Sequence, residues 1–378
     1  MSKFALTAEC VFDGEGMRKD VAVVIDGEHI STVVPISKVN VPLRKLGTGI
    51  LAPGFIDLQV NGGGGVLLNE TPTVEGVRAI AAAHRTFGTT GLLPTVITDT
   101  PKVTKAAARA VASAVDQGVP GVLGIHIEGP FIDPARKGAH PEQFIRVPSE
   151  ADVDWLCRLE CGRVLVTLAP NRVSPVIVKR LVDAGVTVSL GHAEATATEA
   201  LAAIEAGALG FTHLFNAMSQ LTGRAAGMVG AALSSPGVFC GIIADGHHVD
   251  PVSLRAAIAA APPGRLFFVS DAMPSAAGGP KSFELQGRPV HVVDGRLQLA
   301  DGTLAGADIT MLDAVRFGHQ HLELSLEDAL RMAARVPAEF LGLQSQYGQI
   351  APGFAASLVH LSSSLTVLET WIEGTSSR

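Results

Sequence analysis

The stretch IHIEGP, residues 125–130, continues an apolar run that begins at Val122 and ends in a Gly-Pro pair. This pattern is typical of a buried strand that stops abruptly at a loop. Glu128 lies just where the strand should end. A carboxylate loses its water in such a place, so it needs a partner cation or a metal ion to compensate. The sequence therefore predicts either an ion pair or a metal site at this strand end.

Composition narrows the class of protein. The 378-residue chain contains 47% hydrophobic and 17% charged residues, which is typical of a folded globular protein rather than a disordered one. The net charge is −7 and no run of Lys or Arg stands out, so nucleic acids and anionic membranes are not expected as partners. We find no signal peptide and no apolar run long enough for a bilayer, and expect a cytoplasmic protein. The four cysteines show no zinc-pair spacing with histidines.

The middle of the chain alternates strand-like apolar runs with alanine-rich helical patterns. The strands are expected at residues 54–60, 91–95, 121–128, 163–168, 186–190, 210–213, 239–244 and 266–270. Apolar residues at helical spacing separate several of them, for example at residues 73–87 and 103–116. Strand–helix units of this number and size predict an α/β fold, a (β/α)8 TIM-like barrel, with a doubly wound sheet as the alternative.

Both ends of the chain contain short strand patterns. Residues 4–34 include a hairpin signal at Asp26-Gly27, and strand-like runs return at residues 357–361 and 367–372. We expect the two ends to share one small β-sandwich domain. The predicted domains are residues 1–51 as its N-terminal part, residues 52–344 as the barrel, and residues 345–378 as its C-terminal part. A further hairpin is expected at residues 283–300, inserted late in the barrel.

Polar residues recur at the predicted C-terminal ends of the strands. They are Gln59, Asn61, Glu128, His192, His213 and Asp271. In a barrel these ends face one mouth, where barrel active sites are built. Glu128, His192 and His213 offer a carboxylate and two imidazoles, a reasonable shell for Zn²⁺ or another divalent ion with one position left open for water. Asp271 would then serve as a general base.

Each of these residues also has an ordinary structural explanation. A histidine at a strand end is more often a hydrogen-bonded structural residue, Glu128 could pair with Arg or Lys, and Asp271 could cap a helix. A single site explains their common position better than separate coincidences do. His126 is expected to be structural or to support the site, either pointing away from Glu128 or lining the barrel interior.

Several segments resemble the amidohydrolase superfamily and, within it, the N-acetylglucosamine-6-phosphate deacetylases, over nearly the whole chain. The segments are PGFIDLQVNG (residues 53–62), HIEGPF (126–131), KGAH (137–140), GHA (191–193), THLFNAM (212–218), TGR (222–224), IADGHHV (243–249) and SDAM (270–273). This group often carries Gln-x-Asn, here Gln59 and Asn61, where most amidohydrolases carry His-x-His. The resemblance implies one tightly bound metal ion per subunit, with zinc expected before iron, cobalt or manganese. A second, weaker position near Gln59 and Asn61 is left open.

The resemblance also implies a role for each matching residue. The metal ligands would be Glu128, His192 and His213. Asp271 would activate the water and then protonate the departing amine, and His140 would contact the acetyl carbonyl oxygen. The sugar phosphate would be held by Asn216, the backbone of Ala217 and Arg224, and also by His248, reaching it from the neighbouring subunit of a homodimer. Glu194, beside His192, adds a negative charge where relatives often have a small polar residue.

The activity implied by the resemblance is hydrolysis of N-acetyl-D-glucosamine 6-phosphate to D-glucosamine 6-phosphate and acetate, in amino-sugar catabolism. One rival is an amidohydrolase that acts on another N-acylated sugar phosphate or amide. Arg224 and His248 argue against a substrate without phosphate, which would not need them. The other rival is a non-catalytic sugar-phosphate sensor, and Asp271 argues against it because a pure binding protein needs no general base.

Overall fold

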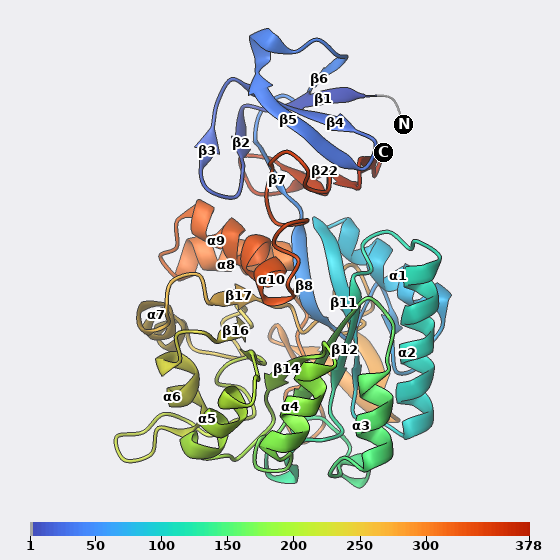
Figure 1. The fold of residues 1–378 in the computed structure, drawn as a ribbon, viewed down its shortest axis with the longest axis vertical. Coiled ribbons are helices and arrows are strands. Elements are labelled where there is room, and N and C mark those ends of the chain that lie inside the picture. The colour runs from blue at the N-terminus through green and yellow to red at the C-terminus, as the bar shows by residue number, and fades with distance from the viewer. Residues whose placement is uncertain (1–2) are drawn as a thin grey trace.

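A barrel with a smaller β unit at one end makes up the computed structural model, which describes residues 3–378 (Figure 1). Residues 1 and 2, where the predicted N-terminal unit begins, lie outside the described residues. Within the described chain, no helix combines the length and the apolar character needed to span a bilayer.

The barrel sheet consists of eight parallel strands in the order β17-β16-β15-β14-β13-β12-β11-β8. Their bounds are β8 (Phe55–Val60), β11 (Thr89–Ile97), β12 (Gly124–Glu128), β13 (Arg163–Leu168), β14 (Thr187–Leu190), β15 (Gly210–Phe211), β16 (Phe239–Ile242) and β17 (Leu266–Phe268). A parallel bridge from Val60 to Ala272 joins the first strand to the segment after the last. The sheet thus closes, which confirms the predicted (β/α)8 barrel and excludes a doubly wound sheet.

Helices follow the barrel strands and cover the outside of the sheet (Figure 1). They are α1 (Val74–Arg85), α2 (Pro101–Asp116), α3 (Glu150–Cys157), α4 (Pro175–Asp183), α5 (Ala197–Glu205), α6 (Gly227–Ser234), α7 (Pro251–Ala260), α8 (Met311–His321), α9 (Leu326–Ala333) and α10 (Arg335–Phe340). Local sequence starts several of them: Ser149, Thr196 and Thr310 form capping boxes with the acidic residue three positions later.

One end of the barrel is filled by apolar side chains. Phe340 of α10 stacks on Phe267 with ring centroids 5.2 Å apart and lies 5.5 Å from Phe239. A Cβ at Gly210, the first residue of β15, would come within 2.6 Å of the Phe340 ring. Glycine is therefore required there, and the N-terminal ends of the strands are packed shut. The cavity described below lies at the opposite end.

The small unit is a β-sandwich of two sheets, with strand orders β5-β4-β1-β6 and β23-β22-β21-β7-β2-β3. Its strands are β1 (Phe4–Thr7), β2 (Cys10–Phe12), β3 (Met17–Arg18), β4 (Val21–Asp26), β5 (His29–Pro35), β6 (Leu43–Lys45), β7 (Ile50–Pro53), β21 (Leu358–Leu361), β22 (Val367–Ile372) and β23 (Thr375–Ser376). Leu6 and Ile25 of one sheet share a core with Leu51, Leu358 and Trp371 of the other. Both ends of the chain therefore build one sandwich, as predicted.

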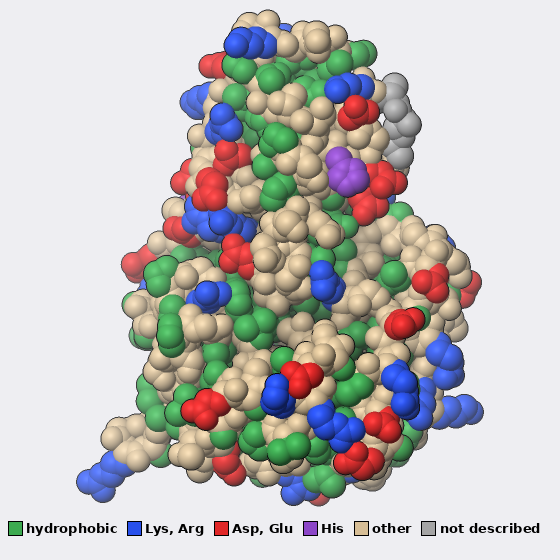
Figure 2. Space-filling view, in the orientation of Figure 1, with side chains coloured by type: hydrophobic (Ala, Val, Ile, Leu, Met, Phe, Trp, Pro, Cys, Tyr) green, Lys and Arg blue, Asp and Glu red, His purple; other side chains and the backbone are tan. Residues whose placement is uncertain are grey.

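An ion pair and hydrogen bonds connect the sandwich to the barrel helices and to the segment after them. Glu15, in the turn between β2 and β3, accepts hydrogen bonds from Arg335 of α10 and from Gln349. Glu327 at the start of α9 accepts the backbone N–H of Met17 at 2.8 Å. Figure 2 shows acidic and basic side chains gathered at the left of this junction.

We propose that the chain is organised as residues 1–53, 54–344 and 345–378, which moves the first predicted boundary from residue 51 to the end of β7 at Pro53. The reason is that β7 pairs with β2 on one side and with β21 on the other. A truncated protein of residues 52–344 would leave part of β7 unpaired and expose the apolar side chains beneath the sandwich, so we expect it to aggregate or to unfold well below the full chain. Thermal unfolding of both proteins tests this expectation. A monomeric truncated protein with the melting temperature of the full chain would contradict it.

The open mouth of the barrel is partly covered by an inserted sheet. Because β8 follows β7 after one residue, the strand starts face the sandwich and the strand ends face away from it. The insertion consists of β18 (Ser282–Leu285), β19 (Arg288–Val293) and β20 (Arg296–Gln298), which pair as an antiparallel meander and confirm the hairpin expected at residues 283–300. A two-stranded hairpin of β9 (Gly62–Gly63) and β10 (Val66–Leu67) follows β8.

Candidate metal centre and active site

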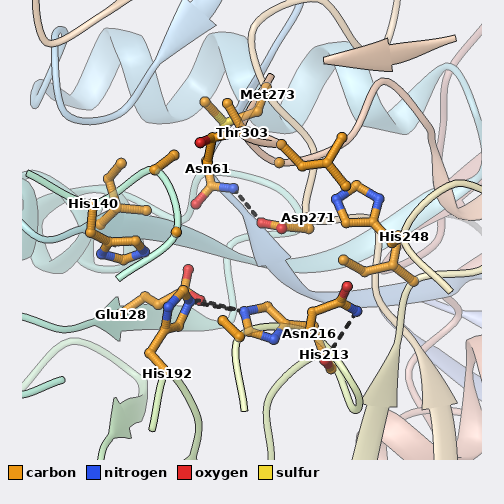
Figure 3. A pocket seen from close by; sticks show the side chains of 18 of the residues that line it. Asn61, Glu128, His140, His192, His213, Asn216, His248, Asp271, Met273 and Thr303 are labelled. Atoms are coloured by element: carbon orange, nitrogen blue, oxygen red, sulfur yellow. Dashed lines mark hydrogen bonds and ion pairs between the residues drawn. The ribbon is translucent and has the colours of Figure 1, made fainter. Parts of the chain in front are cut away.

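Three buried side chains converge where β12, β14 and β15 end. Glu128 is the last residue of β12, while His192 and His213 each lie two residues beyond their strands. The Nε2 atoms of the two histidines lie 3.2 and 3.1 Å from Glu128 Oε1 and 3.1 Å from each other (Figure 3). Ligand atoms about 2.0 Å from one tetrahedral ion would be spaced by roughly 3.3 Å. The three donor atoms therefore have the spacing of a metal shell.

The buried carboxylate of Glu128 favours a positive charge beside it. Burial alone would raise the pKa of Glu128, but hydrogen bonds from His192 and His213 hold it well below its usual range. Burial opposes protonation of His213, yet the hydrogen bond to Glu128 raises its pKa above the ordinary histidine value. The buried Glu128 carboxylate is therefore stabilised by positive charge beside it. A divalent ion fits the same position.

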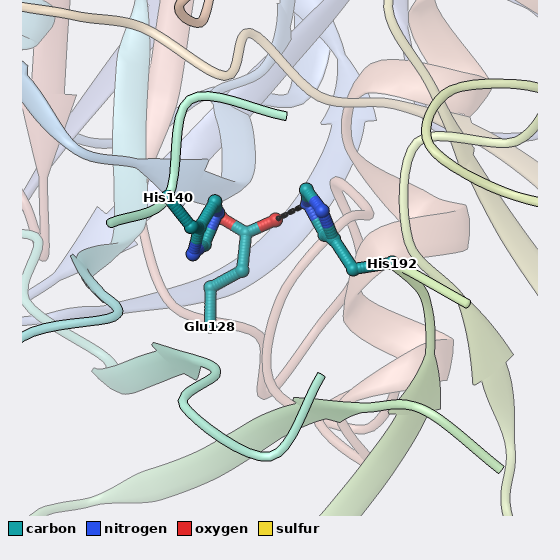
Figure 4. Close-up of side chains that lie close together, drawn as sticks. All are labelled: Glu128, His140 and His192. Carbon is teal, nitrogen blue, oxygen red and sulfur yellow. Dashed lines mark hydrogen bonds and ion pairs between the residues drawn. The ribbon is translucent and has the colours of Figure 1, made fainter. Parts of the chain in front are cut away.

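The hydrogen bonds of the ring Nδ1 atoms show which histidines can bind a metal through Nε2. His192 Nδ1 lies 2.8 Å from the carbonyl oxygen of Arg136, which can only accept, so Nδ1 carries a proton. A neutral His192 ring would then have its lone pair on Nε2 and could exchange its contact with Glu128 for a metal ion. His140 is also near: Glu128, His140 and His192 place ligand atoms within 4.8 Å of one another (Figure 4). However, the backbone N–H of Thr98 donates to Nδ1 of His140, which puts the proton of a neutral ring on Nε2. The proton on Nε2 argues against His140 as the third ligand and leaves His213, whose Nε2 lies 3.1 Å from Glu128 Oε1 and whose Nδ1 has no hydrogen-bond partner in the described chain.

Asp271 lies three residues after β17 and faces the same cavity (Figure 3). Its Oδ1 accepts hydrogen bonds from Asn61 Nδ2 at 2.7 Å and Gln59 Nε2 at 3.1 Å. Burial, and next the charge of Glu128, raise the pKa of Asp271 to about 6. An Asp with a raised pKa is a stronger base than usual and can also return a proton near neutral pH.

Gln59 and Asn61 occupy the space between the two carboxylates. The Gln59 amide nitrogen lies 3.1 Å from both oxygens of Glu128 and 3.1 Å from Asp271. Only an N–H₂ group satisfies three carboxylate contacts, so these two amides act as donors toward the acidic groups. A donor hydrogen cannot bind a cation, and the arrangement therefore disfavours a second metal ion beside Asp271.

A cavity of about 400 Å³ opens above these groups. Arg136 and Ala217 are among the residues that line it, and Figure 3 shows His140 on one side with Asn216 and His248 on the other. Asp245 accepts the Nδ1–H of His248 at 2.6 Å, which leaves Nε2 of His248 for a ligand. Leu285 of the inserted sheet and residues 303–306 complete the wall. The volume lies in the usual range for small-molecule sites.

The structure brings most of the predicted site residues to this cavity, namely Glu128, His140, His192, His213, Asn216, Ala217, His248 and Asp271. His248 lines the cavity of its own chain, which corrects the expectation that it would enter from a neighbouring subunit. Arg224 does not line the cavity in the described chain. It is exposed, in the loop between β15 and α6 that projects at the lower left of Figure 1.

His126 and Glu194, whose roles the sequence left open, make specific contacts in the structure. His126 lines the barrel interior on the same face as Glu128, because residues two apart on a strand point the same way. Its Nε2 lies 2.7 Å from Thr167 Oγ1, and burial lowers its pKa to about 4. Glu194 forms an ion pair with Arg136 at the rim, so the charge it adds is neutralised there.

Sequence reasoning missed Thr98 and Arg136. Thr98 follows β11 directly, and the same signal that identified Glu128 and Asp271, a polar residue at a strand end, could have found it. It was missed because the strand was expected to end at Thr95, two residues before its actual end at Ile97. Arg136 belongs to the long loop after β12, and no local pattern indicates its side chain's position.

Known proteins are similar to this chain in both sequence and fold. The amidohydrolase family model matches residues 50–376. An N-acetylgalactosamine-6-phosphate deacetylase of Shewanella sp. (strain ANA-3) is 46% identical over 88% of this chain and 84% of its own. An N-acetylglucosamine-6-phosphate deacetylase of Haemophilus influenzae is 34% identical over 98% of both chains.

Solved structures agree with these matches. The N-acetylglucosamine-6-phosphate deacetylase of Pasteurella multocida has a TM-score of 0.96 and 35% identity, covering 99% of each chain. An Asp-to-Ala mutant of the Mycobacterium smegmatis deacetylase, in complex with N-acetyl-D-glucosamine-6-phosphate, has a TM-score of 0.92 and 31% identity over 100% of this chain and 99% of its own. The chain therefore belongs to the amidohydrolase family and, within it, to the group that contains N-acetylglucosamine-6-phosphate and N-acetylgalactosamine-6-phosphate deacetylases.

Proposed function

We propose that this protein is a metal-dependent deacetylase that hydrolyses N-acetyl-D-glucosamine 6-phosphate to D-glucosamine 6-phosphate and acetate, in amino-sugar catabolism. The observation that carries the proposal is the convergence of a carboxylate–imidazole shell and a base of raised pKa in one cavity, on a chain of this family. The 4-epimer, N-acetyl-D-galactosamine 6-phosphate, is a second candidate substrate because the Shewanella relative that is 46% identical carries that activity in its name.

We assign the metal to Glu128, His192 and His213, and infer zinc because two imidazole nitrogens and one carboxylate oxygen suit that ion. Iron, cobalt and manganese would accept the same donors. A bound divalent ion would supply Lewis-acid chemistry, polarising the acetyl carbonyl and acidifying a water molecule. Glu128 compensates part of its charge and His192 is held in the ligating tautomer by the Arg136 carbonyl.

The protein's own groups would then move the proton and hold the substrate. Asp271 takes a proton from the attacking water and later delivers it to the amine nitrogen as the C–N bond breaks. His140 donates its Nε2–H to the acetyl oxygen as negative charge develops there. Asn216, the backbone of Ala217 and His248 bind the phosphate at the other side of the cavity.

Acetate release measured side by side tests this function. The substrates are N-acetylglucosamine 6-phosphate, N-acetylgalactosamine 6-phosphate and unphosphorylated N-acetylglucosamine, with metal content determined on the same sample. Preference for the phosphorylated sugars with about one metal ion per chain is the expected result. Turnover of none of them by a metal-loaded sample would reject the proposal, and tight binding without turnover would favour a sugar-phosphate sensor.

Arg224 leads to a proposal about assembly. Its loop projects from the barrel and Leu221 in the same loop is 56% exposed, so neither residue has a partner surface in its own chain that would bury it. We propose that the protein is a homodimer in which Arg224 of one subunit binds the phosphate in the cavity of the other. A guanidinium pairs with phosphate through two parallel hydrogen bonds. The exposed, projecting loop would allow Arg224 to enter the cavity of a second subunit.

Complementation between two inactive variants distinguishes binding of the phosphate by Arg224 of the other subunit from binding by Arg224 of the same subunit. Arg224→Ala and Asp271→Asn should each be nearly inactive alone at low substrate concentration. Co-expressed with two different tags, they should regain about one quarter of wild-type activity, because half of randomly mixed dimers contain one complete site. No recovery in purified mixed dimers would exclude the shared site, and an unchanged KM in Arg224→Ala would exclude any role for Arg224 in binding phosphate.

A further inference from the structure

Among the described residues, Thr98 makes the hydrogen-bond contacts to the Nδ1 atom of His140. The Oγ1 atom of Thr98 lies 2.7 Å from His140 Nδ1, and the Thr98 backbone N–H donates to the same nitrogen at 3.4 Å. Both side chains are buried, with 1% and 5% of their surface exposed. Water therefore does not compete for these contacts, and the contacts with Thr98 determine whether Nδ1 of His140 carries a proton.

The backbone contact decides the direction of the hydrogen bonds. A backbone N–H can only donate, so Nδ1 of His140 must present its lone pair. The Thr98 hydroxyl can donate to the same lone pair, since its other acceptor, the carbonyl oxygen of Glu128, is at the longer distance of 3.5 Å. A neutral imidazole has one proton, which must then be on Nε2. We propose that Thr98 is a positioning residue that fixes His140 as an Nε2–H donor facing the acetyl group of the substrate.

The surroundings keep Thr98 in this place. Gln286, at the tip of the inserted hairpin, donates to the Thr98 carbonyl oxygen at 2.8 Å, and Arg288 donates to the carbonyl oxygen of Ala139, next to His140. A Cβ at Gly129 would lie 2.1 Å from Thr98 Oγ1, and Gly129 has a φ of +81°, so glycine leaves the space that the hydroxyl occupies. The hairpin over the mouth therefore holds both partners of the Thr98–His140 contact.

The chemical consequence rests on the proposed function. In amide hydrolysis the carbonyl oxygen gains negative charge, and a hydrogen-bond donor aimed at it lowers the barrier. His140 can act in this way only with its proton on Nε2. The other tautomer would present a lone pair to a developing oxyanion and would raise the barrier instead. Thr98 thus influences the reaction without contacting the substrate.

Three variants test the kinetic part of the inference. Thr98→Val removes the hydroxyl and keeps the shape, and should lower kcat about tenfold with KM changed by less than about twofold, since one buried hydrogen bond is at stake. Thr98→Ser restores the hydroxyl and should stay within about threefold of wild type. Thr89→Val is the matched control: Thr89 is the first residue of β11, the strand that Thr98 follows, it is similarly buried, and its hydroxyl has no hydrogen-bond partner in the described chain, so kcat of this variant should not change. An unchanged kcat in Thr98→Val, or an equal loss in Thr98→Ser, would overturn the inference.

A direct measurement of the tautomer does not depend on turnover. The zinc-loaded protein labelled with ¹⁵N-histidine is recorded by long-range ¹H–¹⁵N NMR, and the His140 signals are assigned by their loss in His140→Asn. We expect Nδ1 without a proton and Nε2 with one in the wild type, and a partial shift toward the other tautomer in Thr98→Val. A proton on Nδ1 in the wild type would overturn the inference. If the wild type failed to release acetate from either phosphosugar, the proposed function would fail, while this spectrum would still decide the tautomer.

Discussion

Asp271→Asn should lower kcat for the phosphosugar by roughly 10²–10⁴-fold, the usual contribution of a general acid–base group. Asparagine has nearly the same shape and can still accept a hydrogen bond from Asn61, but it cannot take a proton from water. Substrate should therefore bind with little change, because Asp271 is assigned no contact to the phosphate. Steady-state kinetics together with calorimetric titration of the phosphosugar onto the variant would measure the two effects separately.

The pH dependence of the wild type tests the same assignment. Because burial raises the pKa of Asp271 to about 6, the carboxylate form needed for catalysis is lost as the pH falls through that value. The acid limb of kcat should lie at or below pH 6, since a bound cation would favour the charged form further.

A control variant distinguishes this role from a general effect of removing charge. Asp250→Asn alters a carboxylate that caps α7, and asparagine caps a helix equally well, so its kinetics should match the wild type. Full activity in Asp271→Asn, or an acid limb unchanged in a residual activity of that variant, would remove Asp271 from the proposed mechanism.

Glu128→Gln should abolish both metal binding and turnover. The substitution keeps the size of the side chain but removes the negative charge that lies within 3.2 Å of His192 Nε2 and His213 Nε2. We expect about one metal ion per chain in the wild type and a small fraction of that in the variant, with activity reduced in proportion. Elemental analysis of dialysed samples and acetate release on the same samples would measure this.

Metal removal should also affect stability. A ligand that binds only the folded state adds about 2.7 kcal/mol to the free energy of unfolding when its concentration is a hundred times its dissociation constant. Chelation should therefore lower the melting temperature of the wild type and added Zn²⁺ should restore it, whereas Glu128→Gln should respond to neither. Glu142→Gln is the control, because Glu142 pairs with Lys137 on the surface of the loop after β12. Equal metal content in the wild type and Glu128→Gln would contradict the assigned shell.

The order of elements could be predicted from the sequence because it depends on local patterns. The apolar runs before Glu128 and Asp271 indicated strands, and the polar residues at their ends indicated a mouth, since barrel strands share one direction. The hairpin at Asp26-Gly27 was equally local, and β4 and β5 pair around it. Strand limits were less certain: β11 continues to Ile97, and this extension placed Thr98 beside His140.

The sequence by itself determined that Glu128, His192, His213 and Asp271 lie at one mouth, because each is at the end of a strand and a barrel brings those ends together. Only the tertiary structure decided what each atom can do there. Two histidines looked alike in the sequence, yet the carbonyl of Arg136 leaves Nε2 of His192 free for a metal while Thr98 leaves a proton on Nε2 of His140. Similarly, the sequence assigned Arg224 and His248 to one phosphate, but the fold puts His248 in the cavity and Arg224 on a projecting loop. Hydrogen-bond direction and reach depend on contacts between segments far apart in the chain, and no local pattern records them.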